Sequence, residues 1–213
     1  MKKVLCTIQS ILALTLVLGT TSAVAQNVGD NSVYFVTYFA NNLAAAAVPD
    51  ATLRIVNDGS SAANSDSSLW ASIYVFDDSQ ELTECCSCFV SADGLLSESV
   101  KNQLTASPLT SIKPPRGVIK VISSSVNAGG PRNDYPTSNF TNTPTPGLRG
   151  WATHIQSVAN KNPNGPAPYS QTETELADAN LSAGEESMLE LLCKFDFLLS
   201  GKPCRCTFED FDF

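Results

Sequence analysis

The residues with the clearest capacity for chemistry are cysteines in two clusters. The first holds Cys85, Cys86 and Cys88 in the middle of the chain, and the second holds Cys193, Cys204 and Cys206 near its end. Thiols can close disulfides, ligate a metal ion or exchange electrons. The compartment that holds the protein decides between these uses, because it sets the oxidation state of the thiols.

The N-terminal segment has the pattern of a secretory signal peptide. Lys2 and Lys3 form a basic start, residues 11–18 are apolar, and the run Ala-Val-Ala ends at Ala25 as a small-residue cleavage site. The apolar run is well below the roughly 20 residues that a membrane-spanning helix needs. We therefore expect cleavage after Ala25, loss of Cys6 with the peptide, and a secreted or periplasmic protein without a membrane span.

Six cysteines in an exported chain favour disulfides. An even number in an oxidising compartment predicts three bridges, although the sequence does not fix their connectivity. We expect the bridges to run from cluster to cluster and to fasten the C-terminal segment onto the middle of the chain. Each long-range bridge of this kind typically stabilises a fold by about 2–4 kcal/mol.

Two sharper uses of the cysteines remain as alternatives. Cys85 and Cys88 have the C-x-x-C spacing of a dithiol redox site, and with Cys204 and Cys206 they could form a four-thiolate zinc site. A redox site of this type follows a strand within alternating strands and helices, which the sequence does not show. Zinc needs reduced thiolates, which are uncommon outside the cytosol. We therefore expect no metal and no cofactor.

Hydrolytic chemistry has few candidates in this chain. His154 is the only histidine, and no G-x-S-x-G motif is present. It follows Trp151 in a strand-like run, so we interpret it as structural. Asp77 and Asp78 are the best-placed acidic pair for a glycosidase, but neighbouring residues of a strand point to opposite faces. A turn with solvated carboxylates is the simpler interpretation, and no catalytic residue is assigned.

Two long polar segments could form binding loops. Residues 124–147 and 160–172 are rich in Ser, Asn, Gly, Pro and Thr. They carry Tyr135, Phe140 and Tyr169, which are possible ligand-contact aromatics because exposed rings can anchor a partner or stack on a sugar. Aromatic residues in such loops more often fold back into small packing clusters.

Composition restricts the partners. The chain has 213 residues, with 13 basic and 21 acidic ones, and its net charge is −8; loss of Lys2 and Lys3 would make it −10. An acidic surface repels phosphate backbones, so nucleic acid is a poor partner. An extracellular glycan or an envelope protein is the kind of partner that remains.

The mature chain reads mainly as short strands followed by one helix. Runs of β-branched and aromatic residues predict strands at residues 33–39, 52–56, 69–76, 117–122 and 148–155, of which 69–76 suits a strand buried on both faces. Asn57-Asp58-Gly59 is a turn signal. Residues 93–104 could form a short helix.

The late helix has a clear start and an apolar stripe. Ser182 and Glu185 form a capping box. The apolar residues that recur at helical spacing behind it are Met188, Leu189, Leu192, Phe195 and Leu199. Cys193 lies one position from this stripe, so a disulfide from it would fix the helix against the strands.

These elements predict a mainly β fold: an antiparallel, immunoglobulin-like β-sandwich with a C-terminal helix tied on by disulfides. The expected organisation is a signal peptide at 1–25, a β-sandwich with long polar loops at 26–175, and a helix with a disulfide-tied tail at 176–213 that packs on the same domain.

The cysteine pattern carries a resemblance. The strands at 52–57 and 69–77, the cluster Cys85-Cys86-Ser87-Cys88, and the late helix before Cys204-Arg205-Cys206 resemble a group of uncharacterised secreted bacterial proteins. The likeness spans residues 53–206. It implies export and paired cysteines but no activity.

The sequence therefore favours an exported, disulfide-stapled, non-enzymatic protein with a structural, adhesive or binding role at the cell envelope or outside the cell. A carboxylate-based hydrolase of extracellular polysaccharide and a thiolate metal or redox protein are the alternatives.

Overall fold

A computed structural model of the chain describes residues 31–40, 49–105, 107, 109–125, 141–159, 161–162, 164–165 and 168–200. Strands precede one long helix along this part of the chain. Their bounds are β1 Tyr34–Ala40, β2 Thr52–Asn57, β3 Leu69–Asp77, β4 Leu82–Val90, β5 Leu95–Ser99, β6 Arg116–Ser124, β7 Leu148–Ser157, β8 Tyr169–Glu175, β9 Ala177–Asp178 and α1 Ala183–Ser200.

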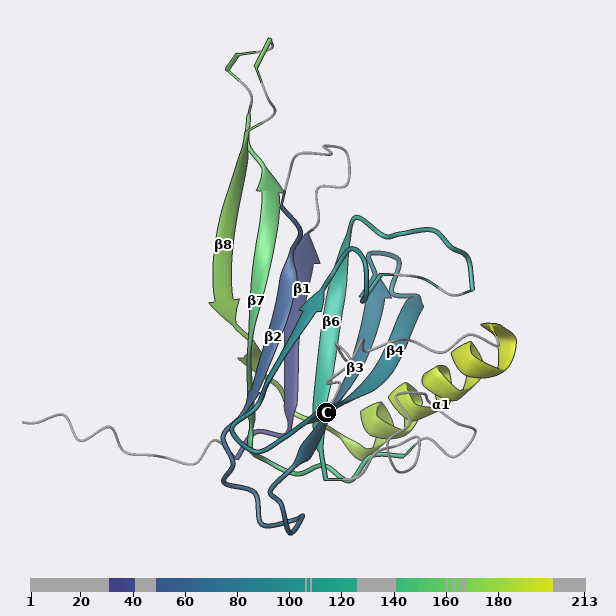
Figure 1. Cartoon of the computed structure of the whole chain (residues 1–213). Coiled ribbons are helices and arrows are strands. Elements are labelled where there is room, and N and C mark those ends of the chain that lie inside the picture. Colours follow the sequence, from purple (N-terminus) through teal and green to yellow (C-terminus); the bar gives the residue numbers. More distant parts are fainter. Residues whose placement is uncertain are drawn as a thin grey trace, which may run out of the picture.

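The strands form two antiparallel sheets that pack as a sandwich (Figure 1). Sheet A has the order β4-β3-β6-β1-β9, and sheet B has the order β5-β2-β7-β8. The chain passes from sheet B to sheet A between β8 and β9, where the buried Leu176 separates the two strands. The prediction of a mainly β, antiparallel sandwich with a C-terminal helix tied on by a disulfide is confirmed.

The core between the sheets follows the period of two that strands impose. In β2, Leu53 and Ile55 are buried, while the alternating Arg54 and Val56 are half-buried. β3 is buried almost throughout, including both Ile73 and Tyr74. One face of β3 meets the interior of the sandwich and the other lies beneath α1, as expected for a strand without polar alternation.

The turn that ends β2 lies where the sequence predicts it. Gly59, in the turn after β2, has φ +69°, a value that suits glycine. The amide of Gly59 donates to Oδ1 of Asn57 at 3.0 Å, and the Asp58 amide donates to the Gly147 carbonyl at 2.9 Å. These bonds end β2 at Asn57 and set the start of β7 beside it.

The predicted helix at residues 93–104 is wrong. Residues 95–99 are strand β5, whose Leu96 lies opposite Ile55 and whose Glu98 lies opposite Leu53 of β2. Turns follow, in which the Ser99 carbonyl accepts from the amides of residues 103 and 104. Pairing with β2 decides the structure here, because tertiary pairing outweighs weak local helical spacing.

The polar segment 160–172 is not a loop over its whole length. Strand β8 begins at Tyr169 and pairs with β7 along seven residues. The strand is exposed and rich in Thr, Glu and Gln, so it lacks the apolar alternation that identifies strands in a sequence. In Figure 1 the β7–β8 ribbon extends beyond the rest of the sandwich.

No helix within the described ranges combines the length and the apolar character needed to cross a membrane.

Candidate binding surface

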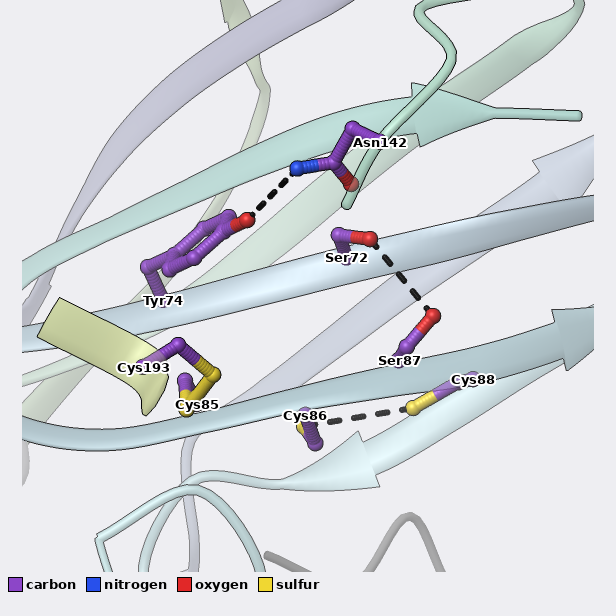
Figure 2. The surroundings of a disulfide bond; sticks show 8 residues. All are labelled: Ser72, Tyr74, Cys85, Cys86, Ser87, Cys88, Asn142 and Cys193. Atoms are coloured by element: carbon purple, nitrogen blue, oxygen red, sulfur yellow. Dashed lines mark hydrogen bonds between the residues drawn. A yellow bond between two sulfur atoms is a disulfide. The ribbon is translucent and has the colours of Figure 1, made fainter. Parts of the chain in front are cut away.

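The disulfide between Cys85 and Cys193 fastens α1 to sheet A. Cys85 pairs with Tyr74 across β4 and β3, and its side chain points to the outer face of the sheet. Figure 2 shows Cys193 reaching from α1 to this sulfur, with Cα atoms 5.7 Å apart and a sequence separation of 108 residues. The sequence-based expectation of a bridge from cluster to cluster that fixes the helix against the strands is confirmed for this pair.

A charged contact fastens the first turn of α1. The Ser182 hydroxyl accepts from the Glu185 amide at 3.1 Å, which is the N-cap bond that the sequence predicts. The Glu185 carboxylate accepts from Lys120 Nζ at 2.5 Å and from the Tyr34 hydroxyl at 3.0 Å. The hydrogen bond from Lys120 is the main reason that the pKa of Glu185 is lowered.

A half-buried asparagine fastens the middle of the helix. Asn142 Nδ2 donates to the Tyr74 hydroxyl at 2.9 Å (Figure 2). The backbone amide of Asn142 donates to Glu190 Oε1 at 2.6 Å. Tyr74 is fully buried, and desolvation raises its pKa far above the usual range. The segment after residue 140, sheet A and α1 thus form one bonded unit.

α1 has two apolar faces, and the apolar stripe identified in the sequence is divided between them. The sheet-facing side consists of Leu189, Leu192, Cys193 and Asp196, of which only Leu192 is half-buried and the others are buried. The other three residues of the stripe point outward. The exposed residues, which we call the outer face of α1, are Met188 (53% exposed), Leu191 (47%), Phe195 (50%), Leu198 (63%) and Leu199 (73%).

This exposed set is the most prominent candidate functional feature of the described residues. Monomeric proteins rarely leave a contiguous group of large apolar side chains in water unless it contacts a partner. The helix that carries the set is held by a disulfide, an ion pair and the hydrogen bonds of Asn142. The outer face is therefore a firmly positioned surface.

The other cysteines lie in the same strand or beyond the described residues. Cys86 and Cys88 are buried in β4, with their sulfur atoms 4.0 Å apart, and Cys88 is also disulfide-bonded. Cys204 and Cys206 lie outside the described residues. Because the Cys85 sulfur is bonded to Cys193, it does not act as a thiolate ligand in this structure. The cluster lies in a nine-residue strand that the sequence analysis did not predict.

The loop aromatics do not form an observable group. Tyr135 and Phe140 lie outside the described residues. Tyr169 is the first residue of β8 and is 42% exposed. A site built from these three rings therefore remains a prediction.

His154 occupies a packed, structural position. It is fully buried, its Nε2 lies 2.7 Å from the Thr174 hydroxyl, and its ring stacks on Tyr38 with centroids 4.0 Å apart. Burial lowers its pKa. Thr174 lies on the neighbouring strand β8, so this contact joins β7 to β8.

Asp77 and Asp78 both have local structural tasks. The Asp77 carboxylate accepts from the amides of Ser79 and Glu81 at 2.8 and 3.0 Å, so it caps the turn after β3. Asp78 forms an ion pair of 2.8 Å with Arg116 on the surface. The two carboxylates serve different partners, as the turn interpretation expects.

Three buried carboxylates escaped the sequence analysis. Glu84 and Glu98 are each 1% exposed, and both Glu98 oxygens lack a hydrogen-bond partner. Burial, and then the charge of Glu84, raise the pKa of Glu98 to about 8. Asp196 is 4% exposed, and burial raises its pKa to about 6. The single glutamate of β5 looks solvated in a sequence, so only pairing with β2 reveals its inward direction.

One pocket lies beside the turn that follows β2. This shallow pocket of about 300 Å³ is lined by small and polar residues, namely Asn31, Ser60, Ser61, Ala62, Ala63, Thr145 and Pro146. It contains no titratable or aromatic side chain. Within the described ranges, no cluster of three or more His, Cys, Asp or Glu residues could hold a metal ion.

Comparison with known proteins provides no functional assignment. No protein-family model and no curated protein matches the chain. Among solved structures, the chain is similar to the Anabaena sensory rhodopsin transducer, with 14% identity, a TM-score of 0.32, and coverage of 45% of this chain and 88% of that one. A likeness this weak supports neither a shared fold nor a shared function.

Proposed function

We propose that the chain is an exported, disulfide-stapled, non-enzymatic protein with a binding or structural role at the cell envelope or outside the cell. In this proposal residues 1–25 are a cleaved signal peptide, and the protein belongs with the secreted proteins that share its cysteine pattern. The mature protein is acidic, and its partner is an envelope protein in preference to a glycan.

The Cys85–Cys193 disulfide carries the proposal. Structural disulfides persist in the periplasm and outside the cell and are rare in the bacterial cytosol. This one joins residues 108 positions apart, and it fixes a helix whose outer face is apolar. A protein partner suits this face better than a glycan, because most of its side chains are aliphatic and present no hydrogen-bonding groups to sugar hydroxyls.

The proposal should be tested by expressing the chain with its own N-terminus in a bacterium that has a periplasm. We expect a mature N-terminus at Gln26, a cross-linked peptide containing Cys85 and Cys193 without reduction, and recovery from the periplasmic or extracellular fraction. Cytosolic retention of the full-length chain with reduced thiols would contradict the proposal.

Binding and catalysis need separate tests. Leu191→Glu places a charge on the outer face of α1, and the control Leu95→Glu places one on a more exposed leucine of β5. We expect only Leu191→Glu to change how the protein distributes among envelope fractions. Turnover of an ester, glycoside or peptide that disappears with Asp77→Ala or His154→Ala would overturn the non-enzymatic assignment.

A further inference from the structure

The outer face of α1 has the spacing of a helix–helix seam. Met188, Leu191, Phe195 and Leu198 follow one another at intervals of three, four and three residues. This is the alternation of the a and d positions of a heptad, which packs side chains of one helix between those of another. All four are about half or more exposed. The spacing therefore indicates that the missing partner is a helix.

The glutamates of α1 lie away from this seam. At 100° per residue, the three glutamates of the helix project about 100° or more from the centre of the seam. Glu185 is bonded to Lys120 and Tyr34, and Glu190 is bonded to the Asn142 amide. The seam consequently presents no carboxylate to a basic partner, although the chain as a whole is acidic.

A neutral, regularly spaced seam is complementary to itself. We propose that the outer face of α1 packs against the same face of a second copy of this chain, with the two helices antiparallel. The proposal rests on the proposed function, because it names the occupant of the same surface. Two-fold symmetric dimers are the commonest protein assemblies, and their interfaces use one surface twice.

The symmetry axis passes beside the midpoint between Leu191 and Phe195. Leu191 then meets Phe195 of the second copy, and Met188 meets Leu198 of the second copy. Each layer combines two different side chains, which fills space better than a pair of identical large ones. Antiparallel helices also place opposite ends of their dipoles side by side.

The size of the seam predicts a weak dimer. The five exposed side chains present on the order of 500 Å² of apolar surface per copy, which is the size of a functional surface patch. A standard interface buries about 800 Å² per partner, so we expect dissociation in the micromolar range or above. Lys194 lies at the flank of the seam, and its side chain meets the same lysine of the second copy beside the axis. Both this contact and the net charge, which is −10 without Lys2 and Lys3, oppose association.

The test is the oligomeric state of the mature, oxidised protein, measured by sedimentation equilibrium at low and high salt over a wide concentration range. We expect a monomer–dimer equilibrium that strengthens with salt, because salt screens like charges. Leu191→Glu should weaken dimerisation by roughly tenfold or more, as loss of a central contact does. Leu95→Glu should have no effect, and Lys194→Gln should strengthen the dimer.

The variants must retain the fold for the result to count. Circular dichroism and an intact Cys85–Cys193 disulfide provide that control, and Phe195→Ala is a milder second substitution in the same seam. A wild-type protein that stays monomeric at high concentration and high salt overturns the inference, as does a dimer that weakens with salt or is unaffected by both seam variants. The proposed function fails separately, through cytosolic retention or enzymatic turnover.

Discussion

Glu98 and Glu84 are buried on the outermost strands of opposite sheets, and one short turn joins those strands. Burial, and then the negative charge of Glu84, raise the pKa of Glu98 to about 8. The Glu98 carboxyl is therefore mostly uncharged at neutral pH. It lies opposite Leu53, in a position where an apolar side chain would be expected.

We predict that Glu98→Gln makes the free energy of unfolding less dependent on pH. The unfolded chain releases this proton near pH 4.5, whereas the folded protein holds it to about pH 8. The stabilising contribution of the protonated carboxyl is thus complete below pH 4.5 and is lost as the pH rises to 8. Glutamine should stabilise the fold at pH 8 by on the order of 2–4 kcal/mol.

Urea unfolding at pH 5, 7 and 8.5 measures this difference, with the exposed Glu81→Gln as the control. Equal pH dependence in the wild type and in Glu98→Gln would show that Glu98 titrates normally.

The disulfide to α1 should contribute strongly to stability. We predict that the double substitution of Cys85 and Cys193 by serine lowers the free energy of unfolding by roughly 3–5 kcal/mol, because the bridge closes a long loop. Chemical denaturation of the oxidised proteins gives the value. Hydrogen exchange should show α1 losing protection before β3 and β6. An α1 that remains protected in the double variant would mean that the noncovalent contacts suffice to hold it.

A single substitution at Asp196 in the helix should stabilise the fold. Burial raises the pKa of this carboxyl to about 6, so its folded-state penalty develops as the pH rises from about 4 to 6 and is complete above that. Asp196→Asn should raise the melting temperature at pH 7, by an amount equivalent to about 1–3 kcal/mol. The matched control is the exposed Asp178→Asn. A lower melting temperature for Asp196→Asn would indicate that the ionised carboxylate is stabilising.

His154 should make the fold sensitive to acid. Its pKa is lowered by burial, so the stability that depends on the neutral ring is complete above pH 6.5 and is lost as the pH falls. We predict that His154→Gln lowers the free energy of unfolding by about 1–2 kcal/mol at pH 7.5 through lost packing. From pH 7.5 to pH 5 the variant should then lose less stability than the wild type does. Urea unfolding of the wild type and the variant at pH 7.5 and pH 5 tests this. A constant difference between them at both pH values would argue against protonation of His154.

Much of the sandwich is predictable from its own residues. The strands at 52–57 and 69–77 have the alternating or fully apolar patterns that sheets with one or two covered faces require, and Asn57-Asp58-Gly59 marks the turn between them. The sequence also predicts a link between the two cysteine clusters, although it does not identify Cys85 and Cys193 as the pair. β8 escaped prediction because an exposed strand needs no apolar alternation.

The outer face of α1 was harder to anticipate. A helix with leucines on both sides gives no sequence signal for the side that meets the sheet. The buried Asp196 also makes the inner face look polar in the sequence. Cys193 was the best indicator, because its bond to Cys85 identifies the buried side of the helix. The inward direction of Glu98 likewise depends on strand pairing, which local sequence does not encode.

The loop closed by Cys85 and Cys193 has a mechanical consequence. A protein that links envelope components can be pulled, and unfolding under tension normally lengthens it by the full contour of its chain. The disulfide separates residues 108 positions apart, so the segment between them cannot lengthen while the bond is intact. That segment contains β5 to β9 with most of β4, and it would otherwise add roughly 360 Å. Reduction of the Cys85–Cys193 bond would therefore remove one restraint on how far the chain extends under tension.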